Sequence, residues 1–474
     1  MYWMGSYAWA AAATVCKRIP QSKIKDNFFL SNYFSSLSPL KKPGKVAIII
    51  VLIMELAQQV PMWEEYCLNT EKMAVVLAAE DGACIHSKYP KAMEEVLYQP
   101  MVLWAVEFCQ KIGIDQVVVL AQPGQDKIEQ VVAAAGVKTL TSLEQTAQAI
   151  GQTKDVLVLP GDVFIMESAL LEKAFAFYKE QSALAAAISL MGKNTGAAWF
   201  AGKELAARLK RAENAVEAFA AAEAPCFAAT LEELCLFETR GDLLEINRRA
   251  NRREIERLWE NGVNIYSTDG IVISPKAQVG QDTTIHPGIQ LKGAVIIGED
   301  CQIGPNTVVE NSTIGDGSTI HSSFIEASAV GNGVRIGPNS HLRPNSTLGD
   351  KVKIGNFVEV KNSLLGEGSS VAHLTYVGDT DMGAHVNMGG GCICVNYNGY
   401  TKARTVIEDN AFIGCNTNLV APVTVKTGAF TAAGSTITEE VPAGALGIAR
   451  ARQVNIAGWI AKHREKAMAG KSQK

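Results

Sequence analysis

The C-terminal half of the chain places an aliphatic residue at nearly every sixth position. The series runs from Ile273 to Met388, stops, and resumes from Ile407 to Val425, with steps of five residues at a few places. A period of six fits neither an α-helix nor a flat sheet, but it fits a three-sided coil whose inward residues stack from turn to turn. The sequence therefore predicts an all-β domain, a parallel β-helix of hexapeptide repeats, over residues 263–454.

The coil pattern is interrupted once. Ile407 follows Met388 by 19 positions where six are expected, and the residues between them are rich in glycine and polar side chains. This composition predicts a loop of about 13 residues that projects from the coil. Loops that project from a rigid scaffold often carry ligand contacts.

Residues 73–240 show a different pattern, in which apolar runs of strand length alternate with helical stretches. Strands are predicted at 74–79, 116–121 and 156–159, and helices at 100–112 and 126–135. This alternation predicts an α/β, Rossmann-like domain with a mostly parallel sheet, whose ligands bind at the carboxyl ends of the strands.

Residues 241–262 and 455–474 predict two further helices. Gly241 and Asp242 are expected to cap the first, which ends at Gly262. Its arginines are interleaved with glutamates, so a salt-bridged, solvated helix is favoured over a patch that binds nucleic acid. The second is expected to be a short amphipathic helix with a basic tail.

Composition narrows the class of protein. A chain of 474 residues should hold two or three domains, and a formal charge of −4 argues against a nucleic-acid coat or a polybasic membrane binder. The longest apolar run, residues 46–54, is shorter than the roughly 20 residues that a bilayer span needs. The ten cysteines are scattered, and the closest pair, Cys392 and Cys394, lacks zinc-type spacing. We expect a cytoplasmic protein with reduced thiols and with neither nucleic acid nor membrane as a partner.

Residues 1–72 differ in composition from the rest. The first 45 carry seven Lys or Arg, one acidic residue and eight aromatics, without an amphipathic period. They are either a basic accessory arm or an upstream extension, in which case translation begins at Met54, Met62 or Met73. The sequence leaves both alternatives open, and the segment is unassigned.

Two motifs follow predicted strands of the α/β domain. The first strand runs into LAAEDGACIHSKYPK, Leu77 to Lys91, and a later strand ends in LPGDV, Leu159 to Val163. These motifs resemble the sugar-1-phosphate nucleotidyltransferases, whose first strand usually ends LAAGxGTRM…PK. The resemblance implies that Asp162 and Asn247 bind Mg²⁺, which would assist transfer from UTP. The positions implied for the nucleotide are Leu77, Ala78, Ala79, Gly82 and Lys91.

The phosphate-binding turn departs from that family in its charge. Glu80 stands at a glycine position, Asp81 follows it, and Cys84 replaces an arginine. A carboxylate about 4 Å from a phosphate charge costs roughly 4 kcal/mol at an effective dielectric near 20. The sequence thus predicts a nucleotidyltransferase fold whose uridylyl transfer is weak or lost. As an alternative, Asp162 simply caps a turn.

Several motifs of the coil are not explained by its period. They include LRP, NFVEVK, VAHLTYVGD and NYNGYTK, which begin at Leu342, Asn356, Val371 and Asn396. Together with the period, they resemble the bifunctional family of N-acetylglucosamine-1-phosphate uridyltransferases and glucosamine-1-phosphate N-acetyltransferases. The resemblance implies a left-handed β-helix, a homotrimer, and acetyl transfer from acetyl-CoA to glucosamine 1-phosphate. The product would supply UDP-N-acetylglucosamine for peptidoglycan and lipid A.

The same resemblance assigns residues to roles. His373 would be the base that deprotonates the sugar amine, a task that suits an imidazole near neutral pH. Arg343 and Lys361 would hold the sugar phosphate, and Lys402 lies on the projecting loop. Tyr376 and Asn387 would hydrogen-bond the sugar. The positions implied for acetyl-CoA are Gly390, Asn396, Tyr397, Cys415, Ala433 and Arg450.

Two of the acetyl-CoA positions depart from the family, which has Ala at Gly390 and Ser at Cys415. Both changes are small in volume and are expected to alter contacts without abolishing activity. Two other functions stay open at this stage, a non-catalytic trimeric scaffold that binds a sugar nucleotide and a hexapeptide acyltransferase for another sugar. For single residues, packing could explain Tyr376 and Tyr397, and solvation could explain Lys361.

Overall fold

The computed structural model describes residues 71–221 and 223–471, and the predictions for residues 1–70 lie outside this range. The described residues belong to the unit Glu71–Lys474. Its first strand, β1, spans Lys72–Leu77, close to the start predicted for the α/β domain at Met73.

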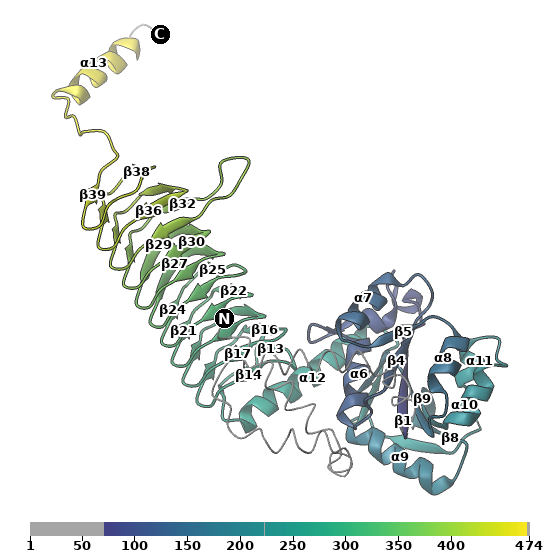
Figure 1. Ribbon diagram of the computed structural model, residues 1–474. Helices are drawn as coiled ribbons and strands as arrows, with labels where there is room; N and C mark the ends of the chain where they lie inside the picture. The colour runs from purple at the N-terminus through teal and green to yellow at the C-terminus, as the bar shows by residue number, and fades with distance from the viewer. Residues whose placement is uncertain (1–70, 222, 472–474) are drawn as a thin grey trace, which may run out of the picture. The chain divides into compact units, whose positions relative to one another are not determined.

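The first half of the described chain is an α/β domain around a seven-stranded sheet with the order β10-β8-β9-β6-β1-β4-β5. Figure 1 shows this sheet in cross-section, with helices packed around it. Strands β6, β1, β4 and β5 are parallel, whereas β9 is antiparallel to β6 and β8. The prediction of a mostly parallel sheet is therefore confirmed, with β9 as the exception. The remaining strands are β4 (Val117–Leu120), β5 (Lys138–Leu140), β6 (Asp155–Pro160), β8 (Ala185–Leu190), β9 (Lys193–Ala201) and β10 (Cys226–Ala229).

Helices cover both faces of this sheet, which explains the unbroken apolar sequence of β1. Ala74 and Val76 pack into one core cluster, while Met73 and Val75 pack into another on the opposite face. The two predicted helices are present, within two residues of their expected ends, as α6 and α7. The helices are α6 (Met101–Lys111), α7 (Asp126–Ala134), α8 (Leu143–Ile150), α9 (Ala169–Gln181), α10 (Gly202–Leu209) and α11 (Ala215–Phe219).

The connecting helix, α12, spans Arg240–Glu260. Its N-cap is Thr239, two to three residues earlier than predicted, and Asp242 completes a capping box from the third helical position. Ion pairs join Arg252 to Glu256 and Arg257 to Glu254, as expected for a solvated helix.

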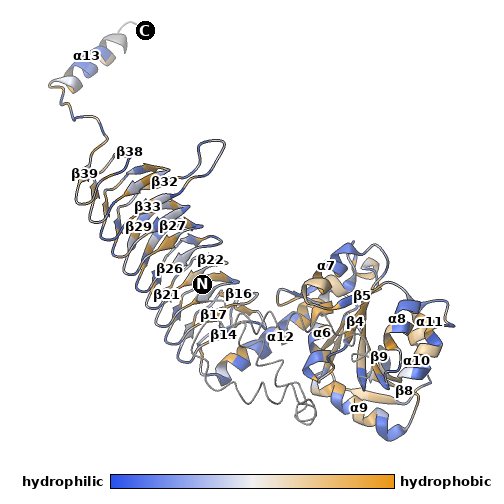
Figure 2. Ribbon diagram, in the orientation of Figure 1, coloured by the Kyte–Doolittle hydropathy of each residue, from blue (hydrophilic) through white to orange (hydrophobic). Residues whose placement is uncertain are grey.

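The second half is a parallel β-helix. Consecutive short strands stack with partners about one coil turn away, as in the pairing of Ile285 with Ile303 and of Ile303 with Ile320. The aliphatic repeat positions from Ile273 to Val425 are buried in one continuous core. Figure 2 shows these apolar positions as a succession of orange bands along the coil. The left-handed β-helix of hexapeptide repeats is therefore confirmed, from β12 (Asn264–Ile265) to β39 (Leu446–Gly447).

The interruption of the repeat is shorter than predicted. Cys394 lies in β32 (Ile393–Val395), is fully buried, and pairs with Leu419 in the next turn. The coil thus continues past Met388, and the projection consists of residues 396–404. The prediction erred because a cysteine occupies an inward position that is otherwise aliphatic.

The last helix, α13, spans Trp459–Lys471, and the ring of Trp459 stacks on that of His463. Its apolar residues do not gather on one face, so the expected amphipathic pattern is wrong. In residues 71–221 and 223–471, no helix is both long and apolar enough to cross a membrane.

Candidate active sites

The longest strands of the coil carry the predicted base. Strands β27 (Lys353–Lys361) and β29 (Ser370–Gly378) each have nine residues and pair in parallel, with Asn356 opposite His373. His373 Nδ1 lies 2.9 Å from Oδ1 of Asn356. With this oxygen as acceptor, Nδ1 carries the proton and Nε2 keeps its lone pair facing away. Asn356 therefore fixes the tautomer that a general base needs, and the imidazole is exposed.

Four of the predicted residues stack along one corner of the coil. Backbone hydrogen bonds connect Gly391 N to His373 O (3.0 Å), Asn416 N to Gly390 O (2.9 Å) and Gly434 N to Cys415 O (2.8 Å). These bonds place His373, Gly390, Cys415 and Ala433 on successive turns, about 4.8 Å apart as neighbouring strands are. We call this series the corner column. Arg450 lies at its end, beside Gly434.

Gly390 of the corner column and its neighbour Gly391 make a matched pair for mutation. A Cβ on Gly390 would meet no atom closer than 3.5 Å, whereas one on Gly391 (φ +74) would lie 2.2 Å from Asn416 Oδ1. Gly390→Ala is therefore expected to raise the free energy of unfolding by about 0.4–1 kcal/mol. Gly391→Ala should lower it, because the left-handed backbone and the contact both oppose a side chain. Chemical denaturation checks this pair, and shifts of equal sign would contradict the geometry.

Three cations lie near the predicted sugar site, Lys361 at the end of β27, Arg343 just after β25 (His341–Leu342) and Lys402 on the projecting loop. Arg343 Nη1 lies 2.7 Å from Glu359 Oε1. The neighbouring Lys402 lowers the pKa of Lys361, helped by burial, while Asp379 opposes this shift. Because Lys402 opposes the protonation of Lys361, an anion bound beside both lysines would relieve their repulsion.

The projecting loop is attached to this cluster through Asn396. Its Nδ2 donates to the buried carboxylate of Asp379 and lies 3.5 Å from Tyr376 Oη. An isolated bridge between Tyr397 and Lys402 closes the loop, and Tyr397 Oη donates to Gly399 O at 2.6 Å. Tyr397 is 56% exposed, so it does not pack in a core.

Asn387 completes the set of predicted sugar ligands. It is exposed on β31 (Asn387–Met388) and pairs with Ser370 at the start of β29. The coil thus distributes the predicted acetyl-transfer residues over a succession of turns.

The α/β domain arranges its predicted site around one buried lysine. Lys91 Nζ lies 2.5 Å from Asp162 Oδ2 and 3.0 Å from Glu80 Oε2. Burial lowers the pKa of Lys91, but its contacts with Asp162 and Glu80 outweigh burial and leave that pKa raised. The cation implied for a triphosphate is therefore already neutralised by two carboxylates.

The other nucleotide positions form the turn that leads to Lys91. Ala78 continues β1 by donating its N–H to Leu120 O at 2.8 Å, and Ala79 O accepts from Gln122 Nε2 at 2.6 Å. Leu77 O accepts from Gly161 N at 2.7 Å, next to Asp162. A Cβ on Gly82 would lie 2.1 Å from Tyr89 O, so the turn itself requires glycine there. These contacts hold the backbone of the turn, although the side-chain charges of the turn differ from those of the nucleotidyltransferase family.

The residues implied for Mg²⁺, Asp162 and Asn247, each have partners within the protein. Asn247 Oδ1 accepts from Leu97 N at 3.0 Å, and its Nδ2 donates to Glu95 O and Leu243 O. Asp162 is paired with Lys91. Over residues 71–221 and 223–471, no group of three or more His, Cys, Asp or Glu could hold a metal. Asn247 instead ties α12 to the segment at Glu95–Leu97.

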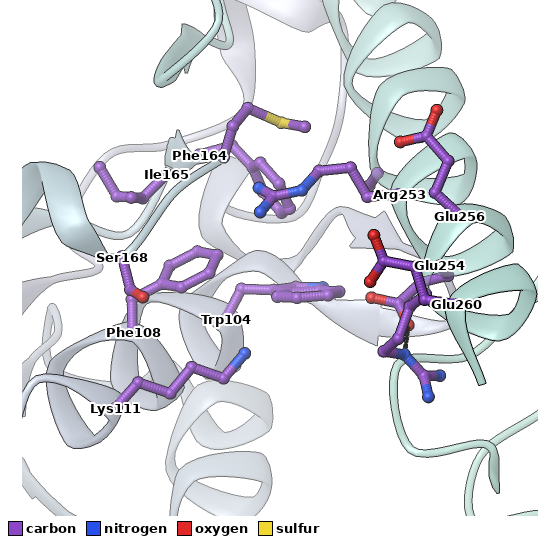
Figure 3. A pocket seen from close by; sticks show the side chains of 13 residues that line it. Trp104, Phe108, Lys111, Phe164, Ile165, Ser168, Arg253, Glu254, Glu256 and Glu260 are labelled. Carbon is purple, nitrogen blue, oxygen red and sulfur yellow. Dashed lines mark hydrogen bonds and ion pairs between the residues drawn. The ribbon is translucent and has the colours of Figure 1, made fainter.

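A separate cavity of about 390 Å³ lies among α6, β7 (Val163–Ile165) and α12. Figure 3 shows its aromatic residues Trp104, Phe108 and Phe164 opposite charged side chains of α12. None of the predicted site residues lines it. Its aromatic side belongs to the core of the α/β domain.

Sequence reasoning missed three polar residues that the structure connects to the site, Asn356, Asn362 and Asp379. All three lie within or next to the motifs, and Asn356 lies opposite His373 while Asn362 Nδ2 donates to Asp379 Oδ1 at 2.5 Å. Both pairs are separated by 17 residues, close to one coil turn. The separation of about one coil turn is the sequence feature from which these pairs could have been predicted.

Comparisons with known proteins agree with the two halves of the fold. Residues 74–226 match the MobA-like NTP transferase domain, and residues 276–311 and 328–362 match the bacterial transferase hexapeptide. Bifunctional protein GlmU of Caldanaerobacter subterraneus subsp. tengcongensis is 36% identical over 446 residues, covering 82% of this chain and 98% of that protein. The protein of the same name from Clostridioides difficile is 34% identical over 457 residues, covering 83% and 98%. The one from Listeria monocytogenes serotype 4b is 35% identical over 458 residues, covering 83% and 99%.

The fold and the sites define a transferase that joins a nucleotidyltransferase domain to a hexapeptide-repeat β-helix. At these identities, over nearly the whole length of the relatives, the chain belongs to the family of bifunctional GlmU proteins.

Proposed function

We propose that this protein transfers the acetyl group of acetyl-CoA to the 2-amino group of glucosamine 1-phosphate. The observation that carries the proposal is the placement of His373 and of the cations Arg343, Lys361 and Lys402 on adjoining turns around β27 and β29. A base for an amine and cations for a phosphate then lie on neighbouring turns of the coil.

In the proposed reaction, Arg343, Lys361 and Lys402 hold the phosphate, while Tyr376 and Asn387 orient the sugar. Acetyl-CoA lies along the corner column, with Asn396, Tyr397 and Arg450 as further contacts. The amine nitrogen attacks the thioester carbonyl, and His373 Nε2 takes the proton that the nitrogen loses. The C–S bond then breaks and CoA leaves, giving N-acetylglucosamine 1-phosphate.

We further propose that the protein works as a homotrimer and that its product serves UDP-N-acetylglucosamine synthesis. Family membership supports both points, and the exposed Phe357 and Leu374 beside His373 offer apolar surface for a neighbouring subunit. We expect the α/β domain to contribute little uridylyl transfer, because Lys91 is neutralised. The scaffold alternative is disfavoured because the imidazole has a defined tautomer and is exposed.

The phosphate requirement separates this proposal from an acyltransferase for another sugar. The wild-type chain should acetylate glucosamine 1-phosphate at least about 100-fold more efficiently than glucosamine, measured as kcat/KM from CoA release. Lys361→Met should remove most of this preference, whereas Lys353→Met, an exposed lysine of the same strand, should retain it. Equal efficiency on both sugars in the wild-type chain would contradict the proposed substrate.

A further inference from the structure

Asp379 is a buried carboxylate at the centre of the cation cluster, and no step of the proposed reaction uses it. It is 5% exposed and lies between β29 and β30 (Thr380–Met382). Its backbone N–H donates to Lys361 O at 3.0 Å. Its side chain accepts from Asn362 on one oxygen and from Asn396 on the other. Each carboxylate oxygen of Asp379 therefore accepts a hydrogen bond from a different segment of the chain.

The charge of Asp379 acts on both lysines of the cluster. Burial raises the pKa of Asp379, but its bonds from Asn362 and Asn396 and the nearby Lys361 and Lys402 outweigh burial and leave that pKa lowered. The carboxylate is thus ionised at neutral pH. It supports the protonated form of Lys361, which Lys402 opposes.

Other carboxylates near the cluster already have a cationic partner. Glu359 pairs with Arg343, and Asp381 pairs with Arg404. Within the described part of the chain, neither Lys361 nor Lys402 forms an ion pair at 4 Å or less. The charged groups that act on Lys361 are Lys402, Asp379 and Arg343. Arg343 in turn faces Glu359, Tyr376 and Glu326, while Arg404 faces Asp381 and Asp379.

We propose that Asp379 is a positioning residue for the sugar phosphate. Its carboxylate holds Asn396 at the base of the 396–404 loop and balances the charges of Lys361 and Lys402 before the phosphate binds. Both lysines then stay cationic and close together in the free protein. This inference rests on the proposed function, since it assigns the lysines to a phosphate.

The sign of the pH effect follows from charge. Lys361 binds phosphate when it is protonated, so binding should weaken as the pH rises through the pKa of this lysine. Asp379→Asn removes the negative charge that favours the protonated form, and this weakening should therefore begin at a lower pH. The new amide also has only one acceptor oxygen for two donors, so Asn362 or Asn396 loses its partner.

The test measures the affinity for glucosamine 1-phosphate by isothermal titration from pH 7 to 10, together with KM and kcat for acetyl transfer. The alkaline limit is the pH above which binding is half lost. In Asp379→Asn, this limit should fall by about half a pH unit or more, and KM should rise by a larger factor than kcat falls. Asp381→Asn is the matched control, because this exposed carboxylate pairs with Arg404 and should leave the limit unchanged. An unchanged limit in Asp379→Asn would overturn the inference.

A second variant keeps the test decisive if Asp379→Asn does not fold. Lys402 is exposed, and Lys402→Met removes the charge that opposes protonation of Lys361 while leaving Asp379 in place. The alkaline limit should then rise, although affinity at pH 7 should fall. An unchanged limit would show that the lysines are not coupled, and the inference would be wrong. Normal binding without any CoA release by the wild-type chain would instead reject the proposed function alone.

Discussion

His373→Ala is expected to lower kcat for acetyl transfer by about 10²–10⁴-fold, equivalent to roughly 3–5 kcal/mol of transition-state stabilisation. In the proposed mechanism, the imidazole that contacts Asn356 would supply the lone pair that accepts the amine proton. The KM for glucosamine 1-phosphate should change much less, because the phosphate contacts lie on other residues. CoA release under saturating substrate measures this effect.

His385→Asn provides the control. This histidine is exposed within one coil turn of His373 and has a positive φ of 55°, which asparagine tolerates. It should release CoA at the wild-type rate. Near wild-type activity in His373→Ala, with the β-helix intact by circular dichroism, would remove His373 from the reaction.

The unmodified chain is expected to release little or no pyrophosphate from UTP and N-acetylglucosamine 1-phosphate, even with excess Mg²⁺. Lys91 is paired with Asp162 and Glu80, and Cys84 stands in place of the arginine that would face the phosphates. Losing such cationic stabilisation commonly costs several kcal/mol, so a rate lower by about 10³ or more is expected.

Glu80→Gly with Cys84→Arg tests the cause of this loss. The first change frees Lys91 from one carboxylate and the second restores a cation, so pyrophosphate release should rise, but only in part. Glu71→Gly is a control in which the charge removed pairs with the exposed Lys154. Robust pyrophosphate release by the unmodified chain would show that the backbone of the turn binds the triphosphate without these side chains.

The sequence predicted the coil well because its period reports directly on burial. Ile303 and Ile320 are fully buried, and each stacks on residues 16 to 18 positions away. The same reasoning failed at Cys394, where hydrophobicity comes from a residue type outside the aliphatic set. The limits of the projecting loop were misplaced for that reason alone.

The side-chain pairs within the sites were harder to predict. The motifs placed His373, Lys361 and Lys402 in the site, but partners such as Asn356 depend on which residues the coil sets opposite one another. The ion pair of Lys91 with Asp162 joins residues 71 positions apart, and it depends on how the turn after β1 folds back. The charge of Glu80 was recognised from the sequence as unusual for this turn. The sequence predicted that Glu80 would repel a bound phosphate, whereas in the structure Glu80 forms an ion pair with Lys91.

The most direct test of the central claim supplies the purified wild-type chain with acetyl-CoA and glucosamine 1-phosphate and follows products by mass spectrometry. We expect N-acetylglucosamine 1-phosphate and free CoA in equal amounts, formed at a rate proportional to protein concentration. Absence of both products, or release of CoA without acetylation of the sugar amine, would contradict the assignment of this β-helix as a glucosamine-1-phosphate N-acetyltransferase.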